Sequence, residues 1–333
     1  MSSRRIESID IAKGLGILLV VLGHQIDYFH ADIPGAYSFI YLFHVPLFFF
    51  LSGLFFRENE SLWNCFKKKF VRLFVPYLLA NVLFFFVEMV RVWKLGTAYD
   101  GDLGWKDLWL ACAGLWPVPS MFSRPTWFIL VLFRITLLYK LIQLVCCGRK
   151  WLMAVVCVTI GIAGACIGYG NFMIGQTMVA LPFLCLGHLC GVQFVEDERI
   201  FGVRTSIAGI LIALPLLWII SLYQQTNIAV NVYGNVALMF AGALLGIFMV
   251  LWISKLVESL PNTTKLLSFV GRYTLSILIW HIFIMKVLFT VAVFVGMENQ
   301  LAMRVTAFIF AVALPCILKM TYSKISVIIN EKY

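Results

Sequence analysis

Lys13 and His24 stand eleven positions apart in the first apolar segment of the chain. Eleven helical steps of about 100° make three turns plus roughly 20°, so both side chains are expected on one helix face, roughly 16 Å apart along the axis. In a bilayer, this spacing places a cation at the membrane edge and an imidazole deep in the hydrocarbon. Ionisable groups at that depth are costly and usually face a cavity, a partner or a substrate path. His24 is therefore a candidate for catalysis or proton handling.

Asp27 follows His24 by three positions and lies about 60° from it on the same helix face. A carboxylate at that place could orient or polarise the imidazole, as the acid of a catalytic triad does. It could equally reach water at the membrane interface and serve no catalytic purpose. Both interpretations of Asp27 stay open.

A second histidine, His44, belongs to the apolar run 43–53, FHVPLFFFLSG. If this segment enters the membrane from the outside, His44 lies roughly 10 Å below the outer surface, and His24 has risen roughly 20 Å from the inside. The two imidazoles are then expected at one depth, where they could flank one cavity. Pro46 and Gly53 in the same run are better explained by a kink and by close helix packing.

A basic stretch follows at 67–77, KKKFVRLFVPY. Lys69 and Arg72 are three residues apart, so on a helix they share a face and can close on one phosphate group. Membrane topology or contact with lipid headgroups explains a lysine run as well. Phosphate binding at Lys69 and Arg72 is thus one of two open interpretations.

Further charged or titratable side chains fall inside other apolar segments: Glu88, Arg134, His281 and Lys286. Arg134 and Lys286 are expected in the outer half of the membrane, beside the histidines. A structural Glu88–Arg134 ion pair would lower the cost of burying both groups. His188 is expected near the inner end of its segment, and we interpret it as a packing or interfacial residue.

Composition indicates the elements that must position these residues. The chain is 62% hydrophobic and 13% charged, with a mean hydropathy of +0.95, whereas soluble domains are about 45–50% apolar and about 25% charged. Ten runs approach the roughly 20 residues that cross a bilayer; they are 11–29, 37–56, 72–93, 126–147, 151–169, 172–194, 202–223, 231–254, 273–296 and 301–320. We predict an all-α, polytopic integral membrane helix bundle, with 1–333 as a single domain.

Charge asymmetry predicts the orientation of the bundle. Most of the 26 basic residues fall on one side if the N-terminus is cytoplasmic, so the positive-inside rule places both termini in the cytoplasm. The same asymmetry accounts for the basic pI and argues against nucleic-acid binding. The first segment carries Asp10 and Lys13 and reaches spanning length, so we expect it to be retained rather than cleaved as a signal peptide. The nine cysteines lie almost wholly in apolar runs and form no disulfide framework.

Several of these residues, taken together, resemble the acyltransferase-3 family of membrane acyltransferases. The resemblance rests on motifs in family order along the chain: Arg5–Asp10–Lys13–His24, the run 43–53, Lys69–Arg72, Trp127-Phe128, and 271–276 through Trp280-His281. Lysine replaces the family's arginine at positions 13 and 69, which keeps the charge but loses the planar bidentate fork. No hydrolase-like domain follows the bundle, so the chain resembles the stand-alone form, similar to sugar O-acetyltransferases of the fucose-acetylase type.

The resemblance implies transfer of an acyl group, commonly acetyl from acetyl-CoA, to hydroxyls of cell-surface glycans or lipid-linked sugars. It implies a cytoplasmic anchor for the CoA phosphates at Lys13, Lys69 and Arg72, and location in the bacterial cytoplasmic membrane. We expect His24 to act as general base, with a nucleophilic His24 as the second possibility. His44, His281 or Arg134 would stabilise the oxyanion. No metal is expected.

Two other classes of function remain. A transporter of a glycan precursor or ion could use Glu88, Arg134 and Lys286 as a charge relay, although the sequence has no inverted repeat. A non-enzymatic partner of an envelope assembly would leave His24 without a role. Slow hydrolysis of acetyl-CoA by the isolated protein would separate the enzyme from both. No residue pattern names the acceptor sugar, the acyl chain or the oligomeric state.

Overall fold

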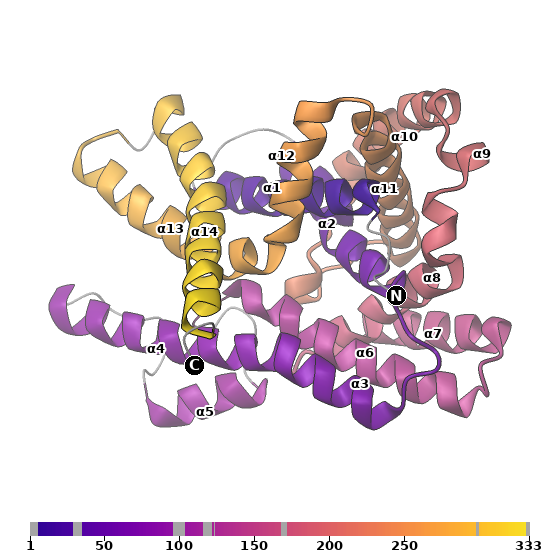
Figure 1. Ribbon diagram of the computed structural model, residues 1–333, viewed down its shortest axis with the longest axis horizontal. Helices are drawn as coiled ribbons and strands as arrows, with labels where there is room; N and C mark the ends of the chain where they lie inside the picture. The colour runs from indigo at the N-terminus through magenta and orange to yellow at the C-terminus, as the bar shows by residue number, and fades with distance from the viewer. Residues whose placement is uncertain are drawn as a thin grey trace. The chain divides into compact units, whose positions relative to one another are not determined.

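The computed structural model describes residues 6–28, 35–95, 104–115, 122, 124–167, 172–297 and 300–330 (Figure 1). For 27, 28, 95 and 322–330 it describes the backbone alone. Regular structure in these ranges is helical, and strand pairing there is limited to an isolated bridge between Asn227 and Val232. The prediction of an all-α chain is confirmed.

The helices, in chain order, are α1 (Glu7–Tyr28), α2 (Ala36–Gly53), α3 (Leu62–Lys69), the π-helix η1 (Phe70–Phe74), α4 (Val75–Leu95), α5 (Trp105–Ala113), the 3₁₀ turn η3 (Arg124–Thr126), α6 (Trp127–Val145), α7 (Lys150–Ala165), α8 (Ile174–Val195), α9 (Glu198–Phe201), α10 (Val203–Tyr223), the 3₁₀ turn η4 (Ile228–Val230), α11 (Val236–Val257), α12 (Pro261–Arg272), α13 (Thr274–Phe294) and α14 (Leu301–Asn330).

Within the described ranges, nine helical segments are long and apolar enough to cross a membrane. Each coincides with one of the predicted runs, and the tenth run corresponds to α7, an apolar helix of 16 residues. At 1.5 Å per residue, α7 extends about 24 Å, less than the roughly 30 Å of bilayer hydrocarbon. The polytopic helical architecture is as predicted, with α7 as a shorter member.

The third segment begins ten residues earlier than its apolar run predicts. Ser61 caps α3, its hydroxyl accepting from the Asn64 amide at 3.2 Å, and α3, η1 and α4 then follow without a break from Leu62 to Leu95. The apolar run does not include α3 because this helix carries three charged residues, Lys67, Lys68 and Lys69, which lower its hydropathy. The basic stretch is therefore helical, and its middle, Phe70–Phe74, is a π-helix, a rare element that is frequently found at functional sites.

The described residues form two compact units. The first, 1–48, 195–224 and 241–333, contains α1, most of α2, and α9 to α14 apart from the beginning of α11. In this unit α12, α13 and α14 all pack against α1, and α13 packs along α14. The prediction of a single domain is not tested by this division and stays a prediction.

Close backbone approach joins α1 to α12 in the first unit. A Cβ atom on Gly14 would overlap the main-chain carbonyl of Leu267, and one on Gly271 would overlap that of Asp10. Because both obstacles are backbone atoms, neither can move aside as a flexible side chain would. The two helices can cross this closely only with glycine at both positions.

The second unit, 49–194 and 225–240, contains the end of α2, α3 through α8, and the beginning of α11. Here α6 contacts α3, η1 and α7, and α4 contacts α5. Gly53 of α2 lies against the Leu184 carbonyl of α8, and Gly187 lies against the Phe50 carbonyl. The expected close packing at Gly53 is thus confirmed, and α2 continues through Pro46 to that residue.

Candidate functional site

His24 lies in the fifth turn of α1, and its imidazole is half-buried. The Tyr41 hydroxyl of α2 approaches the His24 Nδ1 atom at 3.4 Å, and the two rings meet edge to face with 6.2 Å between centroids. Tyr41 is 7% exposed, so the contact is screened from bulk solvent. The Tyr41 hydroxyl is thus a polar neighbour of the His24 ring.

His281 of α13 is completely buried beside His24, with 5.2 Å between ring centroids and 42° between ring planes. Its Nδ1 atom lies 2.8 Å from the Ile277 carbonyl oxygen. A carbonyl can only accept, so Nδ1 carries the proton and, in the neutral ring, Nε2 presents a lone pair. In the described part of the chain, this Nε2 atom is buried and meets no hydrogen-bond partner.

His44 of α2 repeats this arrangement one turn beyond Tyr41. Its Nδ1 atom lies 2.8 Å from the Ile40 carbonyl oxygen, and the side chain is buried. The rings of Tyr41 and His44 meet with 4.7 Å between centroids. Tyr41 therefore contacts both histidines of the first two helices. We call His24, Tyr41, His44 and His281 the imidazole cluster; all four belong to the first unit.

Tyr41 contacts both His24 and His44, whose rings are expected at one depth, and no motif in the sequence marked this tyrosine. Tyr41 and His44 are three residues apart on an apolar helix, and this spacing is the sequence feature that could have predicted their contact. His281 joins the cluster because α12 ends at Arg272 and α13 starts at Thr274, directly after the glycine crossing with α1. The catalytic roles assigned to these histidines stay predictions.

Lys13 lies on α1 three turns before His24, and its side chain is 29% exposed. Its Nζ atom pairs with the Asp10 carboxylate at 3.3 Å, one turn earlier in the helix. The predicted stripe of a cation and an imidazole on α1 therefore also includes an acidic residue. The side chain of Asp27 lies outside the described residues, so its expected contact with His24 is untested.

Lys69 and Arg72 stand at the junction of α3 and η1 in the second unit. Lys69 is half-buried and Arg72 is exposed. The electrostatic neighbours of Lys69 include Arg72, Cys65 and Glu60. Two like charges on adjoining turns repel each other, and an anion bound between them would relieve that repulsion. Their assignment as a phosphate anchor stays a prediction.

Arg134 of α6 donates to two main-chain carbonyls in the second unit, those of Gly114 at 2.9 Å and Phe172 at 2.7 Å. Gly114 is the C-cap of α5, so the guanidinium stabilises the negative end of that helix. Glu88 forms an ion pair with Arg91, one turn further along α4, at 2.6 Å. These contacts give Arg134 a structural task, and its predicted oxyanion role remains untested.

In the described ranges, no three His, Cys, Asp or Glu side chains are placed to hold a metal ion together. The polar groups of the imidazole cluster instead supply proton acceptors and a hydroxyl, which suit acid–base chemistry. A family model described as an acyltransferase domain matches residues 6–320. No curated protein and no solved structure matches the chain. The matched region includes both the imidazole cluster and the basic stretch 67–77, which we call the basic segment.

Proposed function

The chain belongs to the acyltransferase-3 family and is an integral membrane acyltransferase, and we propose that it transfers an acetyl group from cytoplasmic acetyl-CoA to a hydroxyl of a cell-surface or lipid-linked glycan. The observation that carries the proposal is the imidazole cluster, in which the half-buried His24 ring lies beside the buried His281 ring within a helix bundle of this family. Acyl transfer from a thioester to a hydroxyl calls for a general base, correct placement and stabilisation of the oxyanion.

In the proposed reaction, His24 is the general base. The reaction uses the tautomer with the proton on Nδ1, the atom that faces the Tyr41 hydroxyl, so that the Nε2 lone pair receives the proton of the acceptor hydroxyl. As Nε2 takes the proton, the acceptor oxygen attacks the thioester carbonyl and forms a tetrahedral oxyanion. Collapse of this intermediate breaks the carbon–sulfur bond, and the imidazolium returns the proton to the departing CoA thiolate. A nucleophilic His24 that carries the acetyl group is the second-ranked route.

His281 is the second candidate for the base. The Ile277 carbonyl fixes its tautomer, and its Nε2 lone pair is buried without a partner in the described residues. A neutral ring in this tautomer accepts at Nε2 and cannot donate to an oxyanion. The same argument applies to His44, whose Nδ1 faces the Ile40 carbonyl. Oxyanion stabilisation by either ring therefore requires its protonated form, whereas proton acceptance does not.

The donor is proposed to bind through its nucleotide phosphates at Lys13, Lys69 and Arg72. The exposed guanidinium of Arg72 and the neighbouring Lys69 support this assignment, since charge-assisted bonds to phosphate are strong. Lys13 already pairs with Asp10, so it contributes less net charge than the other two. The proposed acceptor is a cell-surface glycan or a lipid-linked sugar, whose hydroxyl would enter the imidazole cluster.

We place the protein in the bacterial cytoplasmic membrane with both termini in the cytoplasm. The excess of basic residues on one side supports this orientation. Fusion of a reporter that is active only in the cytoplasm to either terminus checks it. Activity of both fusions is expected, and an inactive pair would reverse the orientation and remove the basic segment from the donor side.

Release of free CoA from acetyl-CoA tests the proposed function directly. Purified protein in nanodiscs is assayed with a mixture of candidate glycan acceptors, with wild type beside His24→Ala, Arg72→Ala and the control Lys255→Gln. We expect His24→Ala to lower the rate by about 10²–10⁴-fold, Arg72→Ala to weaken donor affinity, and Lys255→Gln to match wild type. Full activity of His24→Ala would exclude His24 as the base. Absence of both release and CoA binding would favour a transporter.

A further inference from the structure

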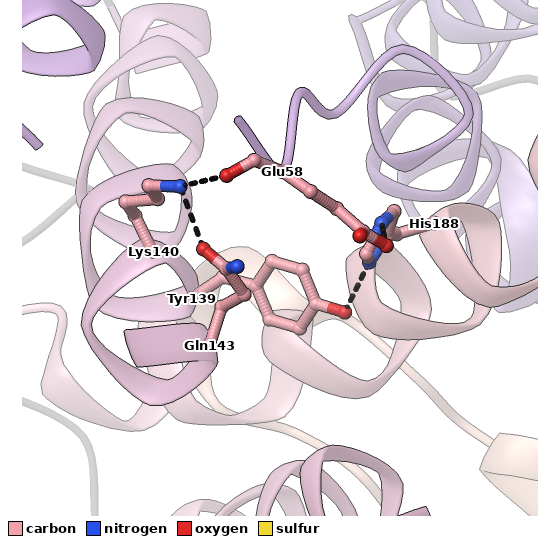
Figure 2. Close-up of polar contacts among 5 residues, drawn as sticks. All are labelled: Glu58, Tyr139, Lys140, Gln143 and His188. Carbon is pink, nitrogen blue, oxygen red and sulfur yellow. Dashed lines mark hydrogen bonds and ion pairs between the residues drawn. The ribbon is translucent and has the colours of Figure 1, made fainter. Parts of the chain in front are cut away.

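A second polar cluster lies in the second unit, where the connector between α2 and α3 meets α6 and α8 (Figure 2). It consists of Glu58 on the connector, Tyr139, Lys140 and Gln143 on α6, and His188 on α8. Figure 2 shows Glu58 stretched between the Lys140 ammonium at its main-chain end and the His188 ring at its carboxylate end. Glu58 is therefore held at its main chain by Lys140 and at its carboxylate by His188.

Both ring nitrogens of His188 are engaged. The Nε2 atom lies 2.9 Å from the Glu58 carboxylate, and the Nδ1 atom lies 2.7 Å from the Tyr139 hydroxyl. An ionised carboxylate only accepts, so Nε2 carries a proton. The His188 side chain is 8% exposed, whereas that of Glu58 is 48% exposed. His188 is thus a buried anchor for a carboxylate on the surface, in addition to its ring contacts with Phe56 and Tyr139.

Lys140 supplies the other attachment. This residue is 1% exposed, and its Nζ atom donates to the Glu58 carbonyl and to the Gln143 side-chain oxygen, each at 2.6 Å. The ammonium also lies 5.6 Å from the centroid of the Phe56 ring. Burial of an ammonium group is costly unless strong hydrogen bonds compensate it. A charge this deeply buried therefore resists any movement of the connector that would break its bonds.

The connector leads directly into the basic segment. Glu60 pairs with Lys68, and Ser61 caps α3. The segment packs on the same helix that holds Glu58: the Phe133 ring of α6 contacts Phe66 of α3 at 6.1 Å and Phe74 of η1 at 5.2 Å between centroids. The α6 helix is therefore the common frame for the anchored connector and for Lys69 and Arg72.

Electrostatics link the two places more directly. Cys65, buried on α3, has both Lys69 and Lys140 among its electrostatic neighbours. Cys65 therefore lies close to both the lysine that anchors the connector and the first residue of the basic pair. Loss of the His188 contact would also leave a surface carboxylate without its partner beside a segment that is meant to attract anions.

We propose that Glu58, Lys140 and His188 are positioning residues for the acyl donor: they hold the α2–α3 connector so that Lys69 and Arg72 present their charges to the donor phosphates. The inference rests on the proposed function, because it assumes that the basic segment binds CoA. The three residues touch neither the phosphates nor the reacting atoms, and they act through the geometry of the segment that does.

CoA binding to the full-length protein in nanodiscs tests the proposal. The variants are His188→Phe, which keeps an aromatic ring and loses both polar contacts, and Glu58→Gln, which keeps the main-chain bond to Lys140. Lys255→Gln, which breaks the Lys255–Glu258 pair in the first unit, is the matched control. We expect His188→Phe to raise the Kd for CoA by about tenfold, Glu58→Gln to raise it less, and the control to leave it unchanged.

Two readouts separate positioning from other roles. Arg72→Gln removes a direct ionic contact, so it should flatten the dependence of Kd on salt, whereas His188→Phe should raise Kd without changing that slope. Hydrogen exchange of 58–74 should increase in His188→Phe, with the same number of CoA sites per protein. A fall in the number of sites at constant Kd would show a merely structural role and overturn the proposal.

The remaining outcomes are equally distinct. If wild-type protein binds CoA, and both variants, His188→Phe and Glu58→Gln, bind it with the same Kd, the positioning role is wrong and the proposed function stands. If wild-type protein binds no CoA, the donor assignment fails, and this inference fails with it.

Discussion

The imidazole rings of His24 and His281 lie 5.2 Å apart between their centroids, although one belongs to the first helix and the other to the thirteenth. The crossing of α1 and α12 at two glycines brings them together, because α13 starts three residues after Gly271. One ring has a tyrosine hydroxyl at Nδ1, and the other has a main-chain carbonyl there. Two bases with different partners therefore lie side by side in one cluster.

Replacement of His281 tests which ring takes the proton. His281→Gln removes the Nε2 lone pair, and if His281 only supports His24, the transfer rate should fall by about tenfold rather than by the 10²–10⁴-fold expected for loss of a general base. The measurement is single-turnover acetyl transfer at saturating acetyl-CoA, with His24→Gln measured in parallel. A larger loss in His281→Gln than in His24→Gln would exchange the roles of the two rings.

Tyr41→Phe examines the partner of His24. The substitution keeps the ring that contacts His44 and removes the hydroxyl at the His24 Nδ1 atom. A hydrogen bond of about 0.5–1.5 kcal/mol corresponds to a fall in kcat of about two- to tenfold. Donor KM and thermal stability should change little. Tyr37→Phe, in the ring stacked on Tyr41, is the control, and an equal loss in both variants would refute a specific role for the Tyr41 hydroxyl.

Lys69→Arg and Lys69→Gln measure the donor anchor. Arginine restores a planar fork that can bind phosphate with two bonds, so Lys69→Arg should bind CoA at least as tightly as wild type, whereas Lys69→Gln should bind it more weakly. The difference in Kd between the two variants should become smaller as the salt concentration rises from about 0.1 M to about 1 M, because the Debye length falls from about 10 Å to about 3 Å. Titration calorimetry provides the Kd values. An unchanged Kd in Lys69→Gln would remove Lys69 from the anchor.

Gly271→Ala probes the crossing of α1 and α12. The added methyl group meets the Asp10 carbonyl, and overpacking of this kind costs about 1–3 kcal/mol of unfolding free energy. The thermal midpoint in nanodiscs should fall accordingly, and the acetyl-transfer rate should fall with it as His281 shifts relative to His24. Thr263→Val, on the exposed face of the same helix, is the control. Equal midpoints for Gly271→Ala and wild type would show that the helices can separate without cost.

Arg134→Lys separates a structural role from a catalytic one. Lysine keeps the charge but cannot reach the Gly114 and Phe172 carbonyls together. Loss of one such charge-assisted bond should lower the unfolding free energy by about 1.5–3 kcal/mol and increase hydrogen exchange in α5. The acetyl-transfer rate per folded protein should stay near that of wild type. A large fall in that rate without loss of stability would restore the predicted oxyanion role.

Local rules predicted much of the molecule. Apolar runs located the spanning segments, since crossing hydrocarbon demands about 20 such residues whatever the rest of the protein does. Helical periodicity placed Lys13 and His24 on one stripe, and depth placed His44 near His24. Hydropathy did not predict α3, because its three lysines lower the mean hydropathy of this segment. The helix still forms and packs on α6. Hydropathy also missed the π-helix that carries Arg72, which no hydropathy pattern marks.

The sequence by itself determined a polytopic helical membrane protein, its family and the residue types available for chemistry. Only the tertiary structure decided which of those residues meet: Tyr41 and His281 with His24, Arg134 with main-chain carbonyls, and His188 with Glu58. The reason is geometric. Periodicity states which side chains share a face of one helix, but which faces come together depends on contacts between distant segments, such as the glycine crossing of α1 and α12.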